Sequence, residues 1–322
     1  MRHSVSDLLS QSPALLTPTP WRNEVLSSSA PGAPGAYARR MRLEQSQVEL
    51  PTPTGPMRTY LYRPVADPGR PLTGDPGRFP GLVLFSEIYQ RTGPIHRMAA
   101  TMAGHGLLVV VPEIFHELEP PGTVLPYDAE GTASGNHHKV AKPISAYDSD
   151  SRAAVDHLVS RPDCDGRIGA MGVCIGGHLA FRCALDPRVQ AALCIYATDI
   201  HKGTLGLGGD DSLSRAGEIK GELMMIWGRQ DPHIPFEGRA KIQAALSAND
   251  LCFTWHELSG AHAFMRDEGP RHDPALALLV YRMGLDLLGR MPTQTSPPDP
   301  LSHAAVVNFV ARERGSAGES RS

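Results

Sequence analysis

The sequence has no long hydrophobic run and no block of like charge in its 322 residues. Its longest apolar stretches, such as residues 106–111 and 275–280, are far shorter than the roughly 20 residues that a membrane-spanning helix needs. The formal net charge of −3, without a basic cluster, gives no electrostatic reason to expect a nucleic-acid partner. Internal repeats are also missing. These absences predict a soluble protein with no membrane or nucleic-acid partner.

Cysteine is scarce, and its placement argues against two common uses. The cysteines are odd in number and include no Cys-x-x-Cys pair, so neither a disulfide framework nor a zinc knuckle is predicted. Such usage is typical of a reducing compartment, and we expect a cytoplasmic protein. The 14 histidines include no His-Glu-x-x-His motif, so we expect no metal and no other cofactor. The five cysteines are Cys164, Cys174, Cys183, Cys194 and Cys252.

Both ends of the chain differ in composition from its middle. Residues 1–46 are rich in Ser, Pro, Ala and Gly and show no periodicity, which predicts a mobile tail. Their arginines and few acids leave an organellar leader open, although Asp7, Glu24 and the prolines favour a plain disordered extension. Residues 291–322 form a second polar tail, in which residues 304–312 could make a short helix. We expect residues 47–290 to form one domain.

Apolar runs alternate with helical patterns through this middle part. The expected strands are residues 47–50, 58–63, 82–86, 107–111, 167–171, 191–196, 222–227 and 252–257. The expected helices are residues 95–103, 148–160, 177–185, 238–247 and 273–288. The inner strands are almost wholly apolar, as strands of a parallel sheet covered on both faces must be. The pattern predicts an α/β fold whose ligands gather at the carboxyl ends of the strands.

The stretch GAMGVCIGGHLAF, residues 169–181, places a cysteine among glycines between an expected strand and an expected helix. The spacing Gly172-x-Cys174-x-Gly176 is that of a nucleophile elbow, a tight turn that lifts one side chain above the end of a sheet. Glycines suit such a turn because a Cβ there would clash with neighbouring backbone. The alternative is a free cysteine that packs as a small hydrophobic residue. The motif favours the functional interpretation.

Two further candidates follow the ends of later strands. Asp231 comes after the strand that ends at Trp227, and His262 comes after the strand that ends near Glu257. A thiol needs an imidazole to form its thiolate, and the imidazole needs a carboxylate to hold its tautomer. The order nucleophile, acid, histidine is also that of α/β-hydrolases. Alternatively, Asp231 shapes an Asp-Pro turn and His262 is a polar loop residue.

Four stretches resemble the dienelactone hydrolase (carboxymethylenebutenolidase) family of α/β-hydrolases. They are FSEIYQRTGPIHRMAATMAGHGLLVVVPEIF, GVCIGG, WGRQDPHIP and GAHAFMRDEG, and the similarity covers roughly residues 47–288. The resemblance implies an α/β-hydrolase fold with a mostly parallel central sheet and helices on both faces. It also implies a triad of Cys174, Asp231 and His262 and the hydrolysis of a small ester or lactone.

The resemblance assigns a regulatory role to Glu87, which holds the resting thiol neutral and later removes its proton. The position agrees, because Glu87 directly follows an apolar strand, where a carboxylate is costly to bury unless something donates to it. The alternative is a surface glutamate at the end of a strand. The fold itself predicts an oxyanion hole from the backbone N–H groups of Ile88 and Ile175.

Substrate recognition is less well defined. Arg266 matches a family arginine that binds a substrate carboxylate, and a guanidinium can hold a carboxylate with two hydrogen bonds. A second family arginine is expected after PEIF, where this chain has His116 and Glu117. We therefore expect a small, anionic ester or lactone, with another small ester or a thioester left open. A non-catalytic ligand receptor with the same fold is a further alternative. The oligomeric state stays open.

Two connections are also expected to contact the substrate site. The long segment of residues 116–147 exceeds what a plain connection needs and is predicted to form part of a lid. The connection that follows the strand ending at Tyr196 faces the same edge of the predicted sheet. Weak candidates for substrate contact in the two connections are His137, His138, Lys139, Asp199, His201 and Lys202. Solvent-exposed loop residues are the alternative for the two adjacent histidines.

Overall fold

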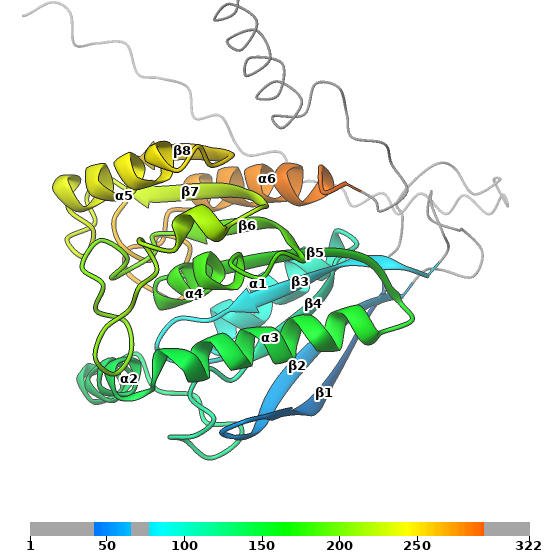
Figure 1. The fold of residues 1–322 in the computed structure, drawn as a ribbon. Coiled ribbons are helices and arrows are strands. Elements are labelled where there is room, and N and C mark those ends of the chain that lie inside the picture. The colour runs from blue at the N-terminus through cyan, green and yellow to red at the C-terminus, as the bar shows by residue number, and fades with distance from the viewer. Residues whose placement is uncertain (1–41, 66–76, 293–322) are drawn as a thin grey trace, which may run out of the picture. The chain divides into compact units, whose positions relative to one another are not determined.

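An eight-stranded sheet forms the centre of the structure, a computed structural model that describes residues 42–65 and 77–292 (Figure 1). The spatial order of the strands is β1-β2-β4-β3-β5-β6-β7-β8. Strands β1 and β2 form an antiparallel hairpin, β2 pairs antiparallel with β4, and every other neighbouring pair is parallel. The strands are β1 Arg42–Thr52, β2 Gly55–Val65, β3 Phe79–Phe85, β4 Leu108–Pro112, β5 Cys164–Val173, β6 Val189–Ile195, β7 Glu222–Gly228 and β8 Phe253–Leu258.

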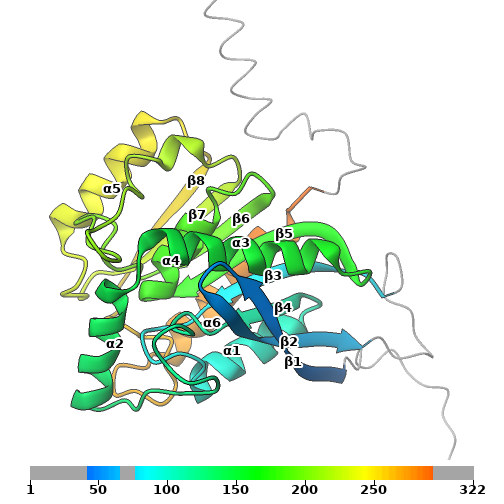
Figure 2. The same ribbon diagram turned by 60° about the horizontal axis from the view of Figure 1, so that its bottom comes forward.

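Helices cover both faces of this sheet. Helices α3 and α4 contact each other and lie on one face, whereas α1 and α6 lie on the other (Figures 1 and 2). The helices are α1 Gly93–Gly104, α2 Ala129–Ala141, α3 Ile144–Ser160, α4 Ile175–Cys183, α5 Phe236–Ala248 and α6 Pro274–Gly289, with a 3₁₀ turn at Ala216–Glu218. No helix within the described residues is long and apolar enough to cross a membrane.

The burial of the strands follows from this layering. Every residue of β4, with the sequence LVVVP, is buried, and β3 and the second half of β5 are nearly as apolar and as covered. A parallel strand between two helical layers has no face left for polar side chains. Strand β8, at the edge of the sheet, is only half-buried along its length. The predicted α/β fold with a mostly parallel sheet is confirmed, and each predicted strand has its counterpart.

One difference from the predictions concerns an element boundary. Strand β1 begins at Arg42, so residues 42–46, which the composition assigned to the N-terminal tail, belong to the sheet. Their side chains lie at an exposed edge, and so they show none of the apolar alternation that marks a half-buried strand. The remainder of that tail, and the predicted helix at residues 304–312, lie outside the described residues.

Helix α2 is the one long helix that the sequence pattern missed. Its buried residues are only Gly131 and Gly135, so it carries no apolar stripe of the kind that marks an amphipathic helix. A capping contact begins it, because the Asp128 side chain accepts a hydrogen bond from the Gly131 N–H at 2.8 Å. A Cβ at Gly135 would come within 2.6 Å of the Ile88 carbonyl oxygen, so α2 packs closely on the loop that follows β3.

Candidate active site

Cys174 lies in the tight turn between β5 and α4, as the glycine spacing predicted. Its backbone has φ 59° and ψ −123°, a conformation that residues with a Cβ rarely adopt. Two hydrogen bonds hold the turn against the next strand: the Cys174 N–H donates to Ile195 O at 3.2 Å, and Thr198 N–H donates to Cys174 O at 3.2 Å. A Cβ at Gly172 would overlap the Gly176 carbonyl, so the turn requires glycine at that position.

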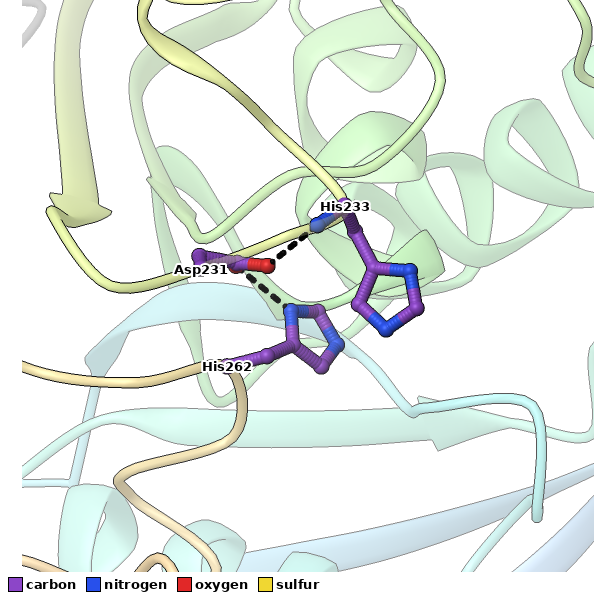
Figure 3. Close-up of side chains that lie close together, drawn as sticks. All are labelled: Asp231, His233 and His262. Atoms are coloured by element: carbon purple, nitrogen blue, oxygen red, sulfur yellow. Dashed lines mark hydrogen bonds and ion pairs between the residues drawn. The ribbon is translucent and has the colours of Figure 1, made fainter.

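Asp231 and His262 meet beyond the carboxyl ends of β7 and β8. The His262 Nδ1–H donates to Asp231 Oδ2 at 2.6 Å, and both residues are buried (Figure 3). The Tyr196 ring packs edge-on against the imidazole, with 5.1 Å between the ring centroids. The carboxylate therefore fixes both the tautomer and the orientation of the ring, which leaves Nε2 as the nitrogen that can exchange a proton.

The second nitrogen of His262 is close to Cys174. Burial of His262 lowers its pKa, but the charge that Cys174 carries once it is a thiolate and the hydrogen bonds to Asp231 and Cys174 outweigh burial and raise the pKa to about 10. Because Asp231 occupies Nδ1, the contact with the sulfur involves Nε2. Thiol, imidazole and carboxylate thus form one chain of contacts in a buried setting, where charge interactions are stronger than in water.

Glu87 and Arg266 are partners of each other. The Arg266 guanidinium donates to both Glu87 carboxylate oxygens, at 3.0 Å from Nε and 2.8 Å from the terminal nitrogen. Glu87 is only 2% exposed, and the Tyr127 hydroxyl lies 3.4 Å from its Oε2. The Arg266 guanidinium also lies over the rings of Tyr89 and Tyr127, at 5.1 and 4.3 Å from their centroids. The interpretation of Glu87 as a surface residue is therefore wrong.

The two amides expected in an oxyanion hole are placed at the same edge of the sheet. Ile175 is the first residue of α4, so its N–H has no partner within the helix. Ile88 lies in the loop directly after β3, two residues beyond the buried Ser86. Strands β3 and β5 are neighbours in the sheet, which brings the two loops that carry these amides together.

The other candidates are in ion pairs or away from this group. His116 and Glu117 join Asp150 and the buried Lys142 in a separate cluster. His138 contacts Glu119 at 2.6 Å, and Lys139 donates to Asp199 at 2.8 Å. The remaining weak candidates differ in burial: His137 and Lys202 are exposed, whereas His201 is buried against Gly238.

One residue at the site was missed by the sequence analysis. The ring of His233 packs against the ring of His262, with centroids 4.6 Å apart, and its backbone N–H donates to Asp231 Oδ1 at 2.9 Å (Figure 3). Its position two residues after Asp231 is the one signal in the sequence that could have identified it. Two cavities of about 410 and 740 Å³ beside α3 contain none of the candidate residues, so the contacts rather than cavity size locate the site.

The sheet order, the cysteine turn and the acid and histidine loops together define an α/β-hydrolase. A model of the dienelactone hydrolase family matches residues 65–291. The chain is 44% identical to a putative carboxymethylenebutenolidase of Saccharomyces cerevisiae over 219 residues, which are 66% of this chain and 78% of that protein. The chain belongs to the dienelactone hydrolase family and is a carboxylic ester hydrolase.

More distant relatives share the same fold. The chain is 27% identical to a carboxymethylenebutenolidase of Pseudomonas putida over 231 residues, which are 70% of this chain and 92% of that protein. The crystal structure of a putative dienelactone hydrolase from Klebsiella pneumoniae matches with a TM-score of 0.64 and 20% identity, covering 77% of this chain and 99% of its own. At that identity the structural match supports the fold alone.

Proposed function

We propose that the protein hydrolyses a small ester or lactone through a covalent acyl-cysteine intermediate. Cys174 is the nucleophile, His262 carries the proton, and Asp231 holds the imidazole in place. The observation that supports this most directly is the chain of contacts from the Cys174 sulfur through His262 to Asp231, placed on a turn with positive φ. Backbone strain of this kind persists at sites where a side chain must be held in one position.

The reaction runs in two halves. The Cys174 thiolate attacks the acyl carbon, and the C–O bond to the leaving alcohol breaks while Nε2 of His262 gives that oxygen its proton. His262 then takes a proton from water, whose oxygen attacks the thioester carbon, and the acid leaves as the sulfur regains its thiolate form. In both halves the amides of Ile88 and Ile175 donate to the oxyanion of the tetrahedral intermediate.

Glu87 regulates the thiol, and Arg266 controls Glu87. In the described structure, both carboxylate oxygens of Glu87 are occupied by Arg266. A substrate that carries its own carboxylate can replace Glu87 on the guanidinium and release it toward Cys174. The freed carboxylate then accepts the thiol proton, so the nucleophile forms only when an anionic substrate is present. This order of steps gives Arg266 the carboxylate-binding role that its position in the chain predicted. It also favours an anionic ester or lactone as the substrate.

The family relation supports the same substrate class. The relatives in Saccharomyces cerevisiae and Pseudomonas putida bear the names putative carboxymethylenebutenolidase and carboxymethylenebutenolidase. We extend to this protein an activity on small lactones and esters with a carboxylate group. Helix α2, which lies against the Ile88 loop through Gly135, forms part of the lid over this substrate.

Mass spectrometry and steady-state kinetics with a panel of anionic and neutral lactones and aryl esters test the proposal. We expect turnover by the wild type, an acyl adduct on Cys174 when the reaction is quenched, and a loss of several orders of magnitude in Cys174→Ala. The half-buried Cys252, in the connection between α5 and β8, supplies the control, and Cys252→Ala should retain activity. Turnover that survives in Cys174→Ala contradicts the proposal, as does tight ligand binding without turnover.

A further inference from the structure

His233 contacts both the histidine and the aspartate of the proposed triad, although the proposed reaction does not use it. Its ring lies against the ring of His262, with the centroids 4.6 Å apart and the planes at 69° to each other (Figure 3). Its backbone N–H donates to Asp231 Oδ1 at 2.9 Å. Any residue except proline could supply the backbone contact, so the side chain of His233 requires a separate explanation.

Asp231 orients the His262 ring from one nitrogen only. The hydrogen bond holds Nδ1 at 2.6 Å from Asp231 Oδ2, and Nε2 lies on the other side of the ring. The torsion that turns a histidine ring about its Cβ–Cγ bond has a broad energy profile, so small tilts of the ring cost little. Proton transfer needs Nε2 within hydrogen-bond reach of its partner, roughly 2.6–3.2 Å. A tilt can therefore lower the rate while the bond to Asp231 persists.

Two neighbouring rings limit such a tilt. The buried Tyr196 packs edge-on against His262 at 5.1 Å, and its own N–H is bonded to Ile226 O at 2.7 Å, so this ring is anchored to the sheet. His233 approaches from the loop after β7. Its distance of 4.6 Å is at the short end of the range of about 4.5–7 Å that edge-to-face ring pairs adopt.

The segment that carries His233 is restrained by its sequence. Pro232 and Pro235 each fix a backbone torsion, and Ile234 between them is buried. Within residues 42–65 and 77–292, no hydrogen bond engages the ring nitrogens of His233, so its side chain meets His262 by packing. The exposed residue thus presents its ring to the triad from a fixed backbone.

We propose that His233 is a positioning residue, whose ring packs against His262 and keeps Nε2 in the orientation that proton transfer requires. The inference rests on the proposed function and assigns no proton transfer to His233 itself. Because ring packing carries the effect, phenylalanine should replace His233, whereas alanine should not. A residue that exchanged protons through its own nitrogens would lose its role in both variants.

Steady-state kinetics on His233→Ala and His233→Phe test the inference. At about pH 8 the His233 ring is neutral, because burial and the charge of His262 hold its pKa below the ordinary 6.5, so phenylalanine changes no charge. We expect kcat to fall roughly tenfold in His233→Ala with little change in KM, and to stay within about twofold of wild type in His233→Phe. Equal losses in the two variants, a loss confined to KM, or an unchanged kcat in His233→Ala would each overturn the proposal.

His137→Ala is the matched control. His137 is also an exposed histidine, and its ring also packs edge-on against a histidine, His138, at 5.8 Å. Its removal should leave kcat unchanged, and a loss equal to that of His233→Ala would contradict a specific role for His233. Circular dichroism and urea midpoints check that all variants are folded.

NMR of the His262 Nδ1–H proton tests the positioning without any substrate. A looser ring should exchange this proton with water faster in His233→Ala, whereas His233→Phe should retain the wild-type rate. If the protein hydrolyses no ester, the proposed function fails, and the exchange rates still decide whether His233 holds the ring. An exchange rate that His233→Ala leaves unchanged would refute the positioning role.

Discussion

Two buried histidine–carboxylate pairs can be compared within this chain. In the candidate active site, His262 donates to Asp231 at 2.6 Å. In the separate cluster around Lys142, His116 donates to Asp150 at 3.1 Å. Both histidine side chains are at most 5% exposed. The pairs differ in what completes them: Cys174 lies beside His262, whereas the ammonium of Lys142 bonds to Asp150.

We infer that this difference separates the proposed catalytic pair from a structural one. The carboxylate of Asp150 is neutralised by a fixed cation, the ammonium of Lys142, and no nucleophile completes the group. The carboxylate of Asp231 has no lysine or arginine partner among the described ion pairs, and it accepts hydrogen bonds from the His262 ring and from the His233 N–H. A buried histidine–aspartate pair therefore indicates catalysis only when the aspartate lacks another cation and a nucleophile faces the second nitrogen.

The largest expected effect is on turnover. Asp231→Asn should lower kcat by on the order of 10³-fold to 10⁴-fold, because an amide does not fix the required tautomer of His262. The matched Asp150→Asn variant should leave kcat of the folded protein within a few-fold of wild type. Steady-state kinetics on both variants, after circular dichroism has checked folding, measures the contrast. Equal losses of kcat in Asp231→Asn and Asp150→Asn would contradict the proposed difference between the two histidine–aspartate pairs.

Lys142 should matter for stability. Lys142→Met leaves Glu117 and the buried Asp150 without their cation, and the free energy of unfolding should fall by about 3–5 kcal/mol. Lys202→Met changes an exposed lysine and should alter stability by less than about 0.5 kcal/mol. Urea unfolding of both variants gives the values. An unchanged urea midpoint in Lys142→Met would mean that the ion pairs of Lys142 contribute nothing to the free energy of unfolding.

The basicity of His262 provides a more direct test of its contact with sulfur. The charge and hydrogen bond of Cys174 help to raise the pKa of His262 to about 10 against the opposing effect of burial. In Cys174→Ala these contributions vanish, so the pKa of His262 should fall. NMR titration of the imidazole ring protons of His262 in the two proteins measures the change. A His262 pKa that is identical in the two proteins would contradict a contact between the Cys174 sulfur and the His262 ring.

The smallest effect is expected at Glu117 under acid conditions. Burial raises the pKa of Glu117, but Lys142 outweighs this and brings the pKa below its ordinary 4.5. A lowered pKa contributes stability that is present above the ordinary value and is lost as the pH falls through the folded value. Glu117→Gln should cost about 1 kcal/mol at neutral pH and little at low pH. In urea unfolding, the free energies of unfolding of the wild type and Glu117→Gln should converge as the pH falls. A difference that stays constant with pH would contradict a contribution from the lowered pKa of Glu117.

The sequence was informative wherever a local constraint acts. Glycines around Cys174 predicted the turn because their spacing reflects backbone crowding, and the apolar runs predicted the strands because burial on two faces permits little else. Helix α2 was missed because its residues lack an apolar stripe. The pairing of Glu87 with Arg266 was missed because the two residues are 179 positions apart, and each has a plausible separate role. Contacts of that kind depend on tertiary packing, which periodicity does not encode.

The positive φ of Cys174 restricts how this enzyme could change its chemistry during evolution. At φ 59° a β-branched residue meets severe steric strain, so threonine could not replace Cys174 as the proposed nucleophile without rebuilding the turn. Serine has the same shape as cysteine and would fit, but its hydroxyl would need a stronger base than a thiol does. The backbone at this one position thus narrows the routes by which related hydrolases could exchange sulfur for oxygen.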